Sequence, residues 1–184
     1  MGIIKQMIKK VFNKIAIFIS LLFLFYLLLP GPSFPSDPPG SLRSSEPGDM
    51  ADPNSRAYFT DLDREDVINH FKSQFDKSKI GNFPLLTIRL RDYPPEETPT
   101  RVRDQIKYSY LEELVNPLRE SIFVSGFEPK TAEDAINVGG KNFKNKITVR
   151  AYWSNPFPRT LIGIGILAVF YALTRFALNL GNRR

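Results

Sequence analysis

Residues 161–180 read LIGIGILAVFYALTRFALNL, and this apolar run decides how the rest of the chain is interpreted. A second run, VFNKIAIFISLLFLFYLLL at residues 11–29, lies near the N-terminus. Each run comes close to the ~20 apolar residues that a helix needs to cross hydrocarbon. The pair predicts two membrane-spanning helices with a folded domain between them.

The first run also has the basic start and apolar centre of a signal peptide. However, bulky residues Tyr26 to Leu29 precede Pro30-Gly31-Pro32, where a cleavable signal would carry small residues. We therefore expect an uncleaved anchor. The alternative, a signal-cleaved domain held only by the C-terminal helix, stays open.

The positive charge of the chain is concentrated at its two ends. The net charge is +6, yet residues 31–160 contain 18 basic and 19 acidic residues. This distribution argues against a nucleic-acid partner and follows the positive-inside rule, so we expect both termini in the cytoplasm and the central domain outside it. The residues expected to anchor the spans at the membrane interface are Lys14, Tyr152, Trp153, Phe157, Arg159 and Arg175.

The residue pattern divides the chain into four segments. Proline, serine and glycine dominate the second of them, which is expected to be a flexible, extended linker. The segments are a basic tail and first helix (1–30), the linker (31–57), an extracytoplasmic domain (58–154), and a second helix with a basic cytoplasmic tail (155–184).

Hydrophobic periodicity predicts an α+β domain in the order α-β-α-β-β, with helices packed on a short sheet. Residues 61–77 form an amphipathic helix, with Thr60 as its cap and Val67, Ile68, Phe71 and Phe75 on one face. Residues 85–91 alternate as a strand with one wet face. Residues 100–126 suggest a long helix interrupted at Pro117. Residues 135–153 suggest a hairpin that turns at Gly139-Gly140.

Few residues in the sequence suggest chemistry. The chain has no cysteine, and its single histidine, His70, lacks converging partners in the pattern. Adjacent carboxylates such as Glu112-Glu113 point apart, so they do not form an acid–base pair. We therefore expect no catalytic residues, no metal, no cofactor and no enzymatic activity.

One cluster combines basic and aromatic residues: Arg89, Arg91, Tyr93, Arg101 and Arg103. Arg89 and Arg91 are expected to share the wet face of a strand, and the other two arginines follow a short turn. Such a patch fits an anionic envelope polymer, lipid headgroups or a protein partner. The alternative is that these charges protect a strand edge from unwanted pairing.

Three stretches carry a resemblance: YFTDLDREDVINHFKSQF, the PPEE segment, and RDQIKYSYLEELVNPLRESIFVSGFEPK. Over residues 57–153 they resemble uncharacterised, conserved-hypothetical two-span envelope membrane proteins of candidate-phyla bacteria. The resemblance implies a bacterial envelope protein and brings with it no activity and no site.

Together these features predict a membrane-anchored binding or assembly module in a cell-envelope complex of a bacterial plasma membrane. Its expected partners are the lipid bilayer, other membrane or envelope proteins, and a second copy of the chain. The alternative is a protein that binds or modifies envelope polysaccharide, which would need a cleft with converging polar groups.

Overall fold

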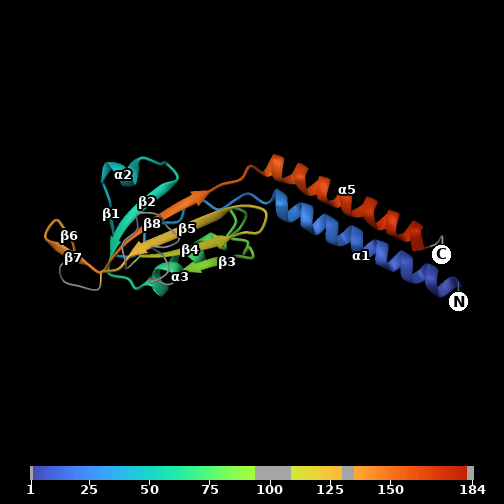
Figure 1. Ribbon diagram of the computed structural model, residues 1–184, viewed down its shortest axis with the longest axis horizontal. Coiled ribbons are helices and arrows are strands. Elements are labelled where there is room, and N and C mark those ends of the chain that lie inside the picture. Colours follow the sequence, from blue (N-terminus) through green and yellow to red (C-terminus); the bar gives the residue numbers. More distant parts are fainter. Residues whose placement is uncertain (1, 94–108, 130–134, 182–184) are drawn as a thin grey trace. The chain divides into compact units, whose positions relative to one another are not determined.

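A computed structural model describes residues 2–93, 109–129 and 135–181 of the 184-residue chain. The chain divides into two units, drawn in Figure 1. The helical unit comprises Met1–Pro30 and Asn155–Arg184, and the sheet unit comprises Gly31–Ser154. The expected α+β class is confirmed, since long apolar helices at both ends of the chain flank a sheet.

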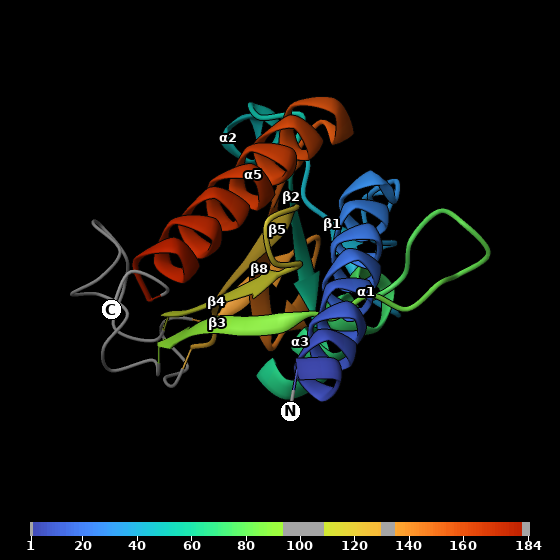
Figure 2. The same cartoon turned by 90° about the vertical axis from the view of Figure 1, so that its right-hand side faces the viewer.

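Six strands of the sheet unit form one antiparallel sheet in the order β1-β2-β8-β5-β4-β3 (Figure 2). β8 lies in the interior between β2 and β5, while β3 forms one edge. The strands are β1 (Leu42–Arg43), β2 (Ser55–Thr60), β3 (Ile88–Tyr93), β4 (Ser109–Val115), β5 (Ser121–Phe127) and β8 (Asn145–Tyr152).

Helix α3 (Arg64–Phe75) covers one face of this sheet. Its apolar residues recur at helical spacing, so they fall on one side of the helix and are fully buried, as expected. They are Val67, Ile68, Phe71 and Phe75. The sheet residues beneath them are Tyr58, Tyr110, Leu114, Ile122, Val124, Ile147, Val149 and Ala151.

The start of α3 differs from the expectation. Thr60 does not cap the helix, because it is the last residue of β2, a strand that the periodicity did not reveal. Asp63 occupies the N-cap position without a side-chain hydrogen bond. The Thr60 hydroxyl instead accepts a hydrogen bond from the Leu62 amide, 3.2 Å away.

The long helix expected over residues 100–126 is wrong in its described part, where β4 and β5 form an antiparallel pair. Both strands carry apolar residues on both faces, so residues such as Leu111, Leu114 and Val115 imitate a helical period. Pro117 lies in the turn between the strands rather than in a kinked helix. Residues 100–108 lie outside the described part of the chain.

The strand expected over 85–91 is present as β3, but its burial was wrongly expected. Leu86, Ile88 and Leu90 are all exposed, the last with 60% of its surface accessible. β3 is an edge strand with a bulge between Arg89 and Arg91, and α3 does not bury this apolar series.

The expected turn at Gly139-Gly140 is confirmed. It joins β6 (Ile136–Val138) to β7 (Lys141–Phe143), with both glycines at positive φ, whereas β8 is a separate strand.

The proline-rich segment after residue 30 packs onto the sheet unit instead of standing apart as a spacer. It contributes β1 and the short helix α2 (Pro47–Met50), and Pro32, Pro35 and Pro38 are buried. The Tyr58 hydroxyl donates a 2.8 Å hydrogen bond to Asp37. Burial, with the neighbouring Asp37 carboxylate, raises the pKa of Tyr58 to about 12. Contacts of this kind compensate for the conformational entropy that the segment loses when it becomes ordered. From composition alone, this loss was expected to remain uncompensated.

The helical unit contains α1 (Gly2–Leu28) and α5 (Pro156–Gly181). Lys10–Leu28 of the first and Pro156–Asn179 of the second are long and apolar enough to cross a membrane. The first also lies where a signal sequence would.

Candidate functional site

Three residues of the expected basic and aromatic patch lie in β3: Arg89, Arg91 and Tyr93. Arg101 and Arg103 fall outside the described residues. Arg89 is opposite Leu114 and Arg91 is opposite Glu113 in the register with β4. Because neighbouring residues of a strand face opposite sides, the two arginines lie on opposite faces of the sheet. The expectation that they share a face is therefore wrong, and the bulge between them is the reason.

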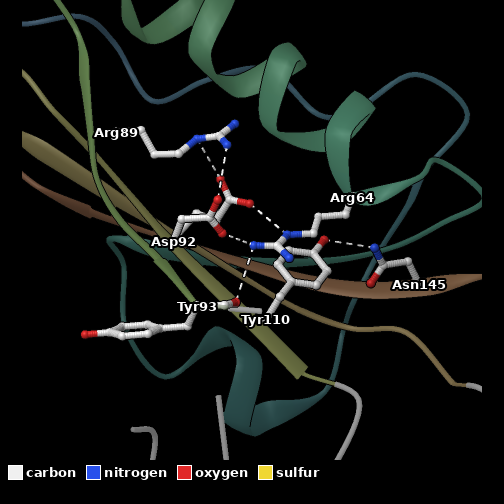
Figure 3. A network of polar contacts seen from close by, with 7 residues as sticks. Arg64, Arg89, Asp92, Tyr93, Tyr110 and Asn145 are labelled. Atoms are coloured by element: carbon white, nitrogen blue, oxygen red, sulfur yellow. Dashed lines mark hydrogen bonds and ion pairs between the residues drawn. The ribbon is translucent and has the colours of Figure 1, made fainter. Parts of the chain in front are cut away.

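Arg89 belongs to a charged cluster on the helix-covered face, shown in Figure 3. Its Nε lies 3.0 Å from Glu112 Oε2, and its Nη1 lies 3.4 Å from Asp92 Oδ2. Arg64, at the first position of α3, donates from Nε to Glu112 Oε1 at 2.8 Å and also pairs with Asp92. Two arginines and two carboxylates thus make the cluster neutral.

Burial dominates the electrostatics of Glu112. Its side chain is 2% exposed, and burial raises its pKa, while the adjacent Arg64 and Arg89 act in the opposite direction. The net rise means that desolvation outweighs the ion pairs.

Tyr110 lies beside this cluster and is fully buried. Asn145 donates a 2.9 Å hydrogen bond to its hydroxyl, and the Arg64 guanidinium lies 5.0 Å from its ring centre. Burial raises its pKa. The ring lies over Gly126 of β5, where a Cβ atom would come within 2.1 Å of Tyr110 Cζ. Because Gly126 has no side chain, the Tyr110 ring fits into the core at this position.

The cluster connects α3 and β3 to β4, and its internal neutrality leaves little positive charge for an anionic ligand. Arg91 is also paired, with its Nε 3.5 Å from Glu113 Oε2. Sequence reasoning missed Arg64 and Glu112 as partners because 48 positions separate them and no local spacing signals the contact.

His70 contacts the proline-rich segment. Its Nε2 lies 3.0 Å from the Ser36 carbonyl oxygen and 2.8 Å from the Gln74 amide nitrogen. Within the described ranges 2–93, 109–129 and 135–181, no three His, Cys, Asp or Glu side chains gather closely enough to hold a metal ion.

The residues expected as interface anchors differ in environment. Lys14 and Arg175 are exposed on the long helices, and Phe157 is 70% exposed at the start of α5. Tyr152 and Trp153 are also exposed, at the end of the sheet unit.

Arg159 is the exception, since it is buried. Its guanidinium binds the C-terminal end of α1: Nε donates to the Leu27 carbonyl oxygen at 2.5 Å, and Nη2 donates to the Leu29 carbonyl oxygen. The last carbonyls of a helix lack partners within it, and Pro30 and Pro32 have no N–H group to supply one. Arg159 thus supplies hydrogen-bond donors that the last carbonyl groups of α1 lack within the helix.

The same contact region packs two side chains closely. Leu27 is buried, and a Cβ atom on Gly163 of α5 would come within 2.3 Å of Leu27 Cδ1. Gly163 therefore faces α1 of its own chain. Gly165 has open space around it.

Comparison with known proteins adds no relative to this description: no family model, no curated protein and no solved structure matches the chain.

Proposed function

We propose that this chain is a two-span membrane protein of a bacterial envelope, and that its sheet unit is a binding or assembly module outside the cytoplasm. The observation that carries the proposal is the bond between Arg159 and the carbonyl groups of Leu27 and Leu29. It makes α1 a structural partner of α5 and argues that α1 is kept.

Removal of α1 as a signal peptide would have two costs. Arg159, only 6% exposed, would lose the carbonyl oxygens of Leu27 and Leu29 as acceptors, and the loss of acceptors costs a buried guanidinium free energy. The space beside Gly163 would also lose Leu27. Both costs favour an uncleaved anchor over a domain held by one helix.

The surfaces of the two helices support a lipid environment. Large apolar side chains point outward along both helices, well beyond the apolar patch that a soluble monomer exposes. Examples are Phe18, Leu22 and Phe25 on α1, and Ile162, Val169 and Phe170 on α5. Basic residues lie toward both chain ends, which favours cytoplasmic termini.

A binding role is favoured over a catalytic one by the β3 edge. Among the described strands β3 lies at the edge of the sheet, an edge strand can pair with another chain, and here Ile88 and Leu90 add exposed apolar side chains. The charged cluster beside it is neutralised internally, which suits a structural connection better than acid–base chemistry.

Retention and topology are tested together. A chain tagged at both ends is expected to appear as one full-length band carrying both tags. Reporters that are active only inside the cell are expected to work at both termini, and reporters active only outside are expected to work within the sheet unit. A shortened mature chain or an external C-terminus would contradict the proposal.

The binding role is tested by affinity capture from detergent-solubilised membranes. We expect wild type to recover another envelope protein in stoichiometric amount, and Leu90→Lys to lose it. The matched control is Lys72→Glu, which changes a charge on the exposed side of α3. A monomer that retains glycans would instead support the polysaccharide-binding alternative.

A further inference from the structure

One end of the sheet is defined by the strand register. Tyr152 of β8 is opposite Ser121 of β5, which is opposite Val115 of β4, which is opposite Ile88 of β3. The β4–β5 turn, the start of β3 and the exit of the chain after β8 therefore lie at the same end. The hairpin of β6 and β7, which precedes β8, joins the sheet at the opposite end.

Four exposed side chains lie at this end by register and connection: Leu86, Leu118, Tyr152 and Trp153. We call this set the apolar end. Leu86 is 68% exposed and Leu118 is 62% exposed. Tyrosine and tryptophan are the side chains that membrane–water interfaces favour, because each combines an apolar ring with a polar group.

Leu118 is unusual for its backbone as well as its exposure. Its φ is 59°, in the left-handed region that glycine and asparagine normally occupy and that a leucine adopts at a cost. A leucine at an exposed turn with this conformation gains nothing from the core.

Hydrogen bonds and an ion pair stabilise the β4–β5 turn that contains Leu118. The Asn116 amide donates to the Glu120 carbonyl oxygen at 2.9 Å, and Arg119 pairs with Glu120 at 2.9 Å with both side chains buried. The Thr87 hydroxyl donates to Asn116 Oδ1 at 2.9 Å, which connects the turn to the residue after Leu86. The charges of the turn are thus directed inward, while its leucine points outward.

Both connections to the long helices leave from this end. Gly31 lies beside the turn, since a Cβ atom on it would be 3.5 Å from Glu120 Cδ. At the other connection, three residues separate Tyr152 from Pro156, the first residue of α5. Such a connection spans at most about 14 Å. If the helices cross a bilayer, as proposed above, this end of the sheet is restrained near the bilayer surface.

We infer that the apolar end inserts into the headgroup boundary of the bilayer and fixes the orientation of the sheet unit over the membrane. The inference rests on the proposed two-span topology. The occupant is lipid rather than another protein because the short connections keep lipid close to this end at all times. Its side chains are also those of the interfacial layer.

The chain contains no cysteine, so single cysteines can be labelled without background. The test uses spin-labelled Leu118→Cys, Asn142→Cys and Val169→Cys in full-length protein, reconstituted in vesicles of phosphatidylethanolamine and phosphatidylglycerol. Collision with oxygen reports lipid, and collision with a water-soluble nickel chelate reports water. Val169 is expected deep in lipid, Leu118 at intermediate depth, and Asn142, near the β6–β7 turn, in water.

The possible outcomes distinguish lipid docking of the apolar end from the two-span topology on which it depends. A label at 118 as wet as the label at 142, with 169 in lipid, overturns docking and leaves the spanning helices standing. A label at 169 in water overturns the spanning proposal itself. A label at 118 shielded from both reagents shows a protein contact and also overturns lipid docking.

A second variant checks the role of the leucine without disturbing the turn. Leu118→Asn keeps a residue that tolerates positive φ, so stability in detergent should not fall. Trp153 is the only tryptophan, and its emission should shift to longer wavelength in vesicles of the variant as the apolar end lifts. An unchanged emission with unchanged quenching by brominated lipid would contradict docking through Leu118.

Discussion

β8 and β3 both alternate apolar and charged side chains, yet one lies in the middle of the sheet and the other at its edge. In β8, Ile147 and Val149 are fully buried beneath α3, while Lys146 and Arg150 face the other way. In β3, Ile88 and Leu90 are exposed, and the strand is connected to β4 and α3 by the ion pairs of Arg89 and Asp92. Apolar burial therefore holds β8, whereas backbone pairing and charge hold β3.

The largest expected effect separates the two strands directly. Ile147→Ala should lower the free energy of unfolding by about 2–5 kcal/mol, because it opens a cavity in the core. Leu90→Ala, the matched change in β3, should stay within about 0.5 kcal/mol, because the leucine is exposed. Denaturant unfolding of the full chain in detergent measures both. Equal losses would show that β3 is also held by apolar burial.

Gly126→Ala extends the comparison to β5. The added methyl group meets the Tyr110 ring, so we expect a loss of about 1–3 kcal/mol in unfolding free energy. Gly48→Ala is the control, because a Cβ atom there meets nothing within 4 Å. A neutral Gly126→Ala would mean that Tyr110 can leave its buried position without cost.

The charged connection of β3 should depend on pH through Glu112. Burial raises its pKa above the ordinary 4.5, so the folded chain binds the proton more tightly than the unfolded chain. Stability contributed by this group is then complete below about 4.5 and declines as pH rises through the folded pKa. Glu112→Gln removes that decline, so wild type should lose stability relative to the variant as the pH rises from below 4.5 through the folded pKa of Glu112. A gap in unfolding free energy that stays constant over this range would refute the assignment.

The smallest expected difference lies at exposed charges, where the two strands should behave alike. Arg91 of β3 and Arg150 of β8 each have a side chain that is 55% exposed, and each pairs with a carboxylate of the described residues. Replacing either with alanine should cost less than about 1 kcal/mol and less still at high salt. Thermal unfolding measures the stability of both variants. A large loss of stability in only one of them would show that its ion pair stabilises the fold although the arginine is exposed.

The same comparison explains what the sequence could predict. Helical spacing identified the buried face of α3, and alternation identified β8, because each pattern is apolar on one side only. β4 and β5 are apolar on both sides, so Leu111 and Val115 completed a false helical period. The position of β3 at an edge depends on which strands pair with which, and no local pattern in residues 85–91 contains that information.

The candidate sites follow the same rule. The sequence identified Arg89 and Arg91 as notable, but the bulge that separates their faces and the carboxylates that neutralise them belong to the tertiary structure. Arg159 was expected at a membrane interface for its charge. Its bond to Leu27 joins residues 132 positions apart, which spacing alone does not reveal.

That bond also sets an order of assembly. In the proposed two-span topology, α1 enters the membrane first, because the chain is made from its N-terminus, and the carbonyl groups of Leu27 and Leu29 are then still hydrated. Arg159 reaches them only after the whole sheet unit has been synthesised. In that topology the sheet unit can fold while it is tethered by one helix, and pairing of α1 with α5 follows the synthesis of the sheet unit.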